Sequence, residues 1–176
     1  MWELHPDDAT ASARVARAER VLEATVGGSS IEELADEGRA RHQLALRLAH
    51  AGRPDAALPH ALRALAIWKE LGRERAVLLA RLRLAELDAR LGDPAGARAA
   101  VLDVLGDPAS APYLFSAHIL LARIASHLRD PESVRAHMTT SLDYLVARGV
   151  TKQIDPTRAL EATLLSHAAR DLEQDH

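Results

Sequence analysis

Histidine is the residue type in this sequence that could support metal binding or acid-base catalysis. The chain of 176 residues has nine histidines and no cysteine. A metal would therefore have to be held by histidine and carboxylate side chains. The sequence has no HExxH pair, no glycine-rich phosphate loop and no nucleophile elbow.

The spacing of the histidines also argues against a shared ligand. His118 and His127 are nine residues apart on one predicted helix, which places them about 180° apart around its axis. His42 and His50 fall on one face, but two turns, roughly 12 Å, separate them. We therefore predict that the chain is not an enzyme and that it holds no metal or other cofactor.

Composition favours an all-helical chain that binds neither nucleic acid nor membrane. The formal net charge is -3, and charged residues of both signs alternate along the chain. A nucleic-acid-binding protein would instead concentrate basic residues. The sequence has no secretory signal and no apolar run of roughly 20 residues, so we expect a cytoplasmic protein. Alanine, leucine and arginine dominate, and these are good helix formers.

A recurring turn signal divides the sequence into helices. It occupies residues 52–55, 92–95 and 129–132, at spacings of 40 and 37 residues, and each copy has proline at its third position. Proline is tolerated at the first position of a helix, and a preceding aspartate can cap it. The signals predict helices over about 54–70, 94–105 and 131–148. Gly72, Gly106 and Gly149 follow them and could end them in the left-handed conformation.

The segments before the second and third signals carry apolar residues at steps of 3, 4, 3 and 4, which is one face of a helix. The two apolar faces are Val77, Ala80, Leu84, Leu87 and Leu91, and Leu114, Ala117, Leu121, Ile124 and Leu128. Two helices per copy in three copies predict a solenoid of helical hairpins.

The copies resemble tetratricopeptide repeats. The family's pair of leucine and a small residue matches residues 44–45, 84–85 and 121–122, and its small positions in the second helix match Ala57, Ala97 and Val134, then Ala64, Val104 and Ser141. The periods exceed the family's usual 34, as in extended repeats of bacterial regulators. The resemblance implies a right-handed solenoid in one domain, residues 1–176, with repeats at 30–71, 73–106 and 110–149.

Two further helices flank the repeats in this prediction, for about eight helices in all. The first covers 7–27, with Val15, Ala18, Leu22 and Val26 on one side, and Ser30 to Glu33 forms a capping box after it. The last covers 155–173 and opens on Asp155-Pro156. Such helices would cover the ends of the array.

In the resembled family, the first helix of each repeat lines a concave groove that binds a partner. The resemblance therefore implies a groove formed by Arg39, His42, Gln43, Leu46, His50, Leu82, Arg83, Glu86, Arg90, Ile119, Arg123 and His127. Its arginines and histidines suit an acidic segment, and its apolar residues suit an amphipathic helix. The lysines and asparagines of the family's carboxylate clamp are absent.

We expect an adaptor that binds a protein or peptide in this groove, as a monomer or a weak homodimer. Two alternatives stay open: a sensory module that responds to a peptide or small effector, and a small chaperone of a secreted protein. Trp68 is expected either to pack against the neighbouring turn or to anchor a partner.

Overall fold

The protein is built from α-helices. The computed structural model describes residues 8–28 and 30–169, which form eight α-helices and two short 3-10 helices, with no strand among them. This confirms the all-α prediction and its count of helices. Contacts divide the chain into two compact units, Met1–Asp93 (unit 1) and Pro94–His176 (unit 2). The division falls within the second predicted repeat.

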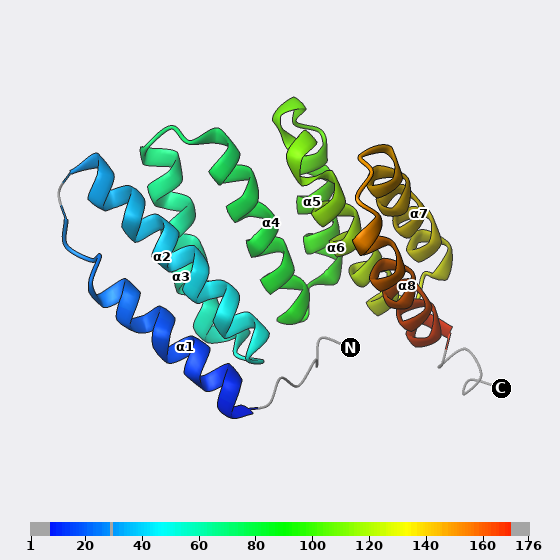
Figure 1. The fold of residues 1–176 in the computed structure, drawn as a ribbon, viewed down its shortest axis with the longest axis horizontal. Helices are drawn as coiled ribbons and strands as arrows, with labels where there is room; N and C mark the ends of the chain where they lie inside the picture. The colour runs from blue at the N-terminus through cyan, green and yellow to red at the C-terminus, as the bar shows by residue number, and fades with distance from the viewer. Residues whose placement is uncertain (1–7, 29, 170–176) are drawn as a thin grey trace. The chain divides into compact units, whose positions relative to one another are not determined.

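Unit 1 is a row of antiparallel helices, which Figure 1 shows from blue to green. Its helices are α1 (Asp8–Glu23), α2 (Ile31–His50), α3 (Pro54–Glu70) and α4 (Glu74–Arg90). Each helix packs against the next in sequence, and α2 also contacts α4. These contacts are those expected of helical hairpins laid side by side.

Unit 2 contains α5 (Pro94–Leu105), α6 (Leu114–His127), α7 (Pro131–Ala147) and α8 (Ile154–Ala169). Here α6 contacts α5, α7 and α8, and α7 also contacts α8. A 3-10 helix over Pro108–Tyr113 joins α5 to α6, and another over Thr151–Gln153 precedes α8. Neither 3-10 helix was predicted.

Each of the three recurring turn signals forms a turn in which one residue has the left-handed backbone conformation, with a positive φ. Gly52 has φ 70°, Gly92 has φ 102°, and Arg129 takes the equivalent place in the third copy with φ 58°. Glycine adopts this conformation without steric cost. Gly72 and Gly149 end their helices in the same way, as predicted. The prediction is wrong for Gly106, whose φ is not positive, because the chain there leads directly into a 3-10 helix.

Side-chain caps start two of the helices as the sequence predicts. Ser30 and Glu33 form both hydrogen bonds of the capping box at α2. The carboxylate of Asp130 accepts from the backbone N–H of Ser133 (2.9 Å) and from its hydroxyl (2.5 Å) at the start of α7. These bonds satisfy amide groups that have no partner within the helix.

The described bounds of the flanking helices differ from the predicted ones. α1 ends at Glu23, so Val26 lies beyond it and is exposed. α8 begins at Ile154, which puts Asp155 and Pro156 inside its first turn. Residues 170–173 of the predicted last helix, with Leu172, and Asp7 of the first lie outside the described residues.

The small residues that align between the copies are among the most buried positions in both units. At all nine aligned positions the side chain is at most 1% exposed; these residues are Ala45, Ala57, Ala64, Ala85, Ala97, Val104, Ala122, Val134 and Ser141. Small side chains let helix axes approach closely, and the surrounding leucines then fill the space between them.

The closest such contact lies between α2 and α3 in unit 1. Gly38 of α2 faces the indole of Trp68, and a methyl group added at Gly38 would lie 2.9 Å from an indole carbon and 3.0 Å from a methyl group of Ile67. Trp68 is 7% exposed and packs in a core cluster with Ile67 and Ala80. Of the two roles expected for Trp68, the structure shows packing.

We predict that Gly38→Leu strongly destabilises unit 1, because its side chain would occupy the space of the Trp68 indole. The expected loss is about 3 kcal/mol, at the upper end for overpacking. Denaturant unfolding followed by tryptophan fluorescence measures it, since Trp68 lies in the core that the substitution disturbs. Ala66→Leu, at an exposed position of α3, is the control and should stay within about 0.5 kcal/mol of the unchanged protein. Equal stability of the two variants would contradict the packing argument.

Candidate functional site

The predicted groove residues fall in both units. Nine of them belong to unit 1, on α2 and α4, and three, Ile119, Arg123 and His127, belong to α6 in unit 2. A groove that continues along all three copies therefore stays a prediction. Within unit 1, contact between α2 and α4 brings the two sets of residues onto neighbouring helices.

Three of the unit 1 residues form an internal ion-pair network on α4. Glu86 lies between two arginines: one carboxylate oxygen bonds Arg83, and the other is 2.7 Å from the guanidinium of Arg90. The three side chains are 6–15% exposed. Arg90 also donates to the backbone carbonyl of Ala49 at the end of α2, and burial lowers its pKa to about 10. Arg90 thus ties α4 to α2.

His42 of α2 lies beside this network. Burial, followed by the positive charge of Arg83, lowers the pKa of its imidazole to about 4. His42 is therefore neutral at physiological pH and adds no positive charge to a groove.

The other predicted groove residues of unit 1 differ from one another in how exposed their side chains are. Leu82 is 5% exposed, so its side chain belongs to the interior and offers little surface to a ligand. Leu46 is half-buried, whereas Gln43 and His50 are exposed. The sequence pattern did not distinguish Leu82 from its neighbours, because its burial depends on how α4 packs.

Unit 1 has a cleft between α1 and α2. The cleft has a volume of about 700 Å³. Its lining residues are Arg14, Arg17, Ala18, Val21 and Thr25 from α1 and its C-terminal end, and Asp36, Arg39, Ala40, Gln43 and Arg47 from α2. Only Arg39 and Gln43 belong to the predicted groove.

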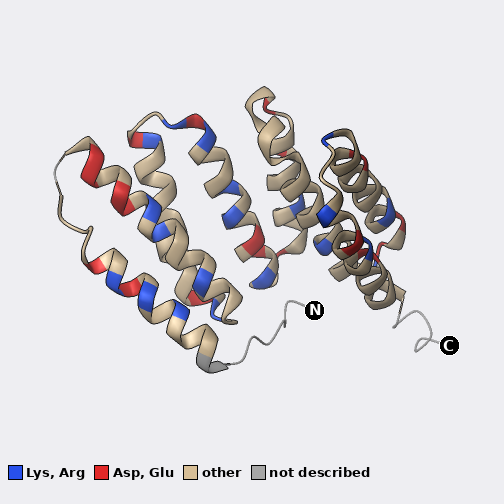
Figure 2. Cartoon of the chain, viewed as in Figure 1, with Lys and Arg blue, Asp and Glu red and all other residues tan. Residues whose placement is uncertain are grey.

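The α1 side of this cleft was missed from the sequence. The prediction gave this helix the role of covering the end of the array, although Arg14, Arg17 and Val21 recur at helical spacing on one of its sides. Figure 2 shows that the acidic residues of α1 and α2 concentrate near the turn that joins them, while basic residues follow farther along.

In unit 2, histidines pair between helices. The Nδ1 atoms of His118 (α6) and His137 (α7) are 3.2 Å apart, and burial lowers the pKa of both imidazoles. The rings of His127 (α6) and His167 (α8) lie edge to face at 5.5 Å, and burial lowers the pKa of His127 to about 4. His118 and His127 thus face different neighbours, in keeping with the prediction that they lie on opposite sides of one helix.

The remaining predicted residues of unit 2 are partly buried. Ile119 packs beside the core cluster that joins α6, α7 and α8, and the side chain of Arg123 is half-buried. Among the described residues, no group of three or more histidine, aspartate or glutamate side chains could hold a metal ion.

The chain matches no protein-family model, and no curated protein or solved structure shows significant similarity to it. Over the described part of the chain, no helix combines the length and apolarity needed to cross a bilayer. The geometry of the two units is therefore the basis for any functional proposal.

We predict that Glu86→Gln destabilises unit 1, because it leaves two largely buried guanidinium groups without their shared carboxylate. Breaking a buried ion pair costs about 3 kcal/mol or more, and the residual exposure here reduces this to about 2 kcal/mol. Glu70→Gln, at the exposed end of α3, removes the same charge and should have little effect. Similar unfolding midpoints in urea for the two variants would show that the network does not hold α4.

We also predict that His42 makes the stability of unit 1 depend on pH. Its pKa of about 4 in the folded chain is below the ordinary 6.5, so the unfolded chain binds the proton more readily. The contribution of His42 is intact above pH 6.5 and is lost as the pH falls from there to about 4. Between about pH 7 and pH 4.5, the melting temperature should therefore fall less in His42→Gln than in the unchanged protein. Parallel curves of melting temperature against pH would contradict this.

Proposed function

We propose that the protein is a non-enzymatic binding module that holds a segment of a partner protein, and that the cleft between α1 and α2 is its binding site in unit 1. The cleft itself is the observation that carries the proposal. Its volume of about 700 Å³ is in the range typical of ligand sites, which are concave and combine apolar walls with a few polar groups.

The lining of the cleft suits a polypeptide. Ala18, Val21 and Ala40 supply apolar contacts, while Gln43 and Thr25 supply hydrogen-bonding groups. A segment bound there would contact two helices whose relative position is set by the core cluster beneath them, with Val15 and Leu22 of α1 against Leu44 and Leu48 of α2. A site on packed helices needs little rearrangement on binding.

This proposal moves the contact surface from the predicted groove to its neighbour. Arg83 and Arg90 are engaged with Glu86, and Leu82 is buried, which leaves Arg39 and Gln43 as the residues common to both surfaces. A right-handed array of the tetratricopeptide type and a cytoplasmic location are parts of the same proposal.

We predict that filling the cleft abolishes selection of peptide ligands. A random peptide library displayed on phage is panned against the full chain, against Gln43→Trp, which places an indole in the cleft, and against Ser12→Trp, which adds one to an exposed position of α1 outside the lining. Peptides enriched on the unchanged protein should bind Ser12→Trp equally and Gln43→Trp at least tenfold more weakly.

Circular dichroism verifies that both tryptophan variants keep their helices. Enriched peptides that bind all three proteins equally would place the site elsewhere. Failure to enrich any peptide on the unchanged protein would contradict the proposed function itself.

A further inference from the structure

An excess of positive charge distinguishes the cleft between α1 and α2. Four arginines and one aspartate line it. Asp36 pairs with Arg39 on the surface of α2. Within the described part of the chain, no ion pair engages Arg14, Arg17 or Arg47, in contrast to the network around Glu86.

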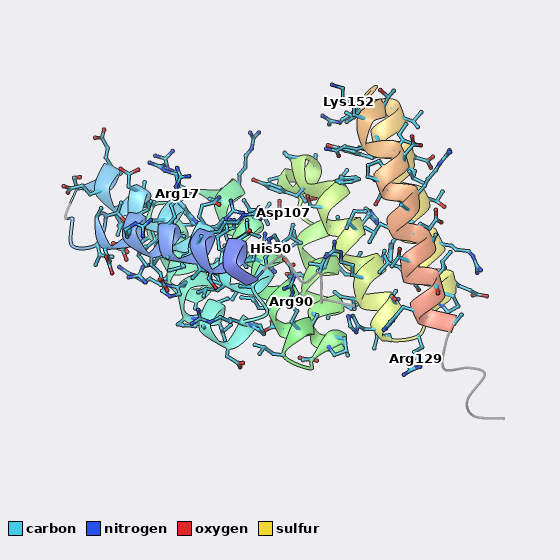
Figure 3. The ribbon with its side chains drawn as sticks, turned by 60° about the horizontal axis from the view of Figure 1, so that its bottom comes forward. Arg17, His50, Arg90, Asp107, Arg129 and Lys152 are labelled. Carbon is cyan, nitrogen blue, oxygen red and sulfur yellow. The ribbon has the colours of Figure 1, made fainter. Side chains whose placement is uncertain are left out.

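The three arginines that form no ion pair within the described part of the chain lie on both sides of the cleft. Arg14 and Arg17 come from α1, and Arg17 is exposed beside the ribbon in Figure 3. Arg47 comes from α2. Arg14 and Arg47 also border an adjoining small recess with His50, so both helices contribute an arginine to that recess.

On the proposed function, in which the cleft holds a polypeptide segment, we propose that the segment is acidic and extended. Guanidinium groups bind carboxylates through paired, charge-assisted hydrogen bonds. Complementary charge would also speed the encounter and select against basic partners.

Helix geometry sets the spacing of the carboxylates. Arg39 and Arg47 are eight residues apart on α2, a rise of about 12 Å. Side chains on one face of an extended chain repeat about every 7 Å. The basic stretch is therefore close to two such repeats in length, so acidic side chains at alternate positions of an extended segment fall along it, and the residues between them can turn toward Ala18, Val21 and Ala40.

A nucleic acid fits the cleft less well than an acidic peptide. The backbone of a nucleic acid carries regularly spaced charge and needs a long basic track. Here the basic stretch is short, and Glu23, Glu32 and Asp36 lie toward the turn between α1 and α2. A longer polyanion would meet these carboxylates, whereas a segment of four to six residues would not.

The experiment measures fluorescence anisotropy of a labelled hexapeptide of alternating glutamate and leucine added to the full chain. The matched peptide has glutamine in place of glutamate. We expect the acidic peptide to bind at least tenfold more tightly, and its affinity to fall as salt is raised from about 50 to 300 mM.

The variants test where the acidic peptide binds. Arg14→Gln with Arg47→Gln should weaken binding at least tenfold. Arg20→Gln with Arg53→Gln removes the same charge from exposed positions of unit 1 outside the cleft and should change binding less than twofold.

Several results would overturn the inference. Equal binding of the two peptides would show that the segment need not be acidic, while peptide binding itself would stand. An equal loss of affinity for the acidic peptide in the two double variants would show that binding responds only to the net charge of the protein. Tighter binding of a labelled oligothymidylate, or a change from monomer to dimer that depends on Arg14 and Arg47, would assign the cleft to nucleic acid or to a second copy.

Discussion

Contact between helices through small side chains is the constraint on which the rest of this structure depends. Ala45, Ala57 and Ala64 in unit 1 and Ala122 and Val134 in unit 2 have almost no exposed surface. A larger side chain at any of them would push two helices apart and open the layer of leucines around them. The same constraint explains why Gly38 stands opposite Trp68, since the largest side chain of the core needs the smallest neighbour.

Cores made of alanine and leucine bury little area per residue, and unit 1 adds charged links between its helices. Glu37 of α2 accepts from Arg41 on the same helix and lies 3.5 Å from Arg63 of α3. Glu86 of α4 has two arginines, one of which reaches the carbonyl of Ala49 in α2. In each case a nearly buried carboxylate joins an arginine of its own helix to a neighbouring helix. Ion pairs of this kind specify which helices meet more than they add to stability.

The features that could be predicted from the sequence are those determined by neighbouring residues. Turns such as 52–55, the Ser30 capping box and the aligned small positions depend on backbone conformation and helical period, and the structure confirms them. The C-terminal end of α1 was predicted at residue 27 and lies at Glu23. The site was harder to predict, because an arginine at helical spacing looks the same whether it faces solvent, as Arg17 does, or a carboxylate one turn away, as Arg90 does.

The position of α1 at the edge of unit 1 affects the free energy with which any ligand binds in the cleft. Among the described helices of unit 1, α1 makes backbone contacts with α2 alone, so its local unfolding disrupts fewer contacts between helices than that of α2 or α3. One wall of the cleft is thus the part of unit 1 with the fewest neighbours. Part of the binding free energy of an occupant would go into holding α1 in place, and amide hydrogen exchange in α1 would slow when the cleft is filled.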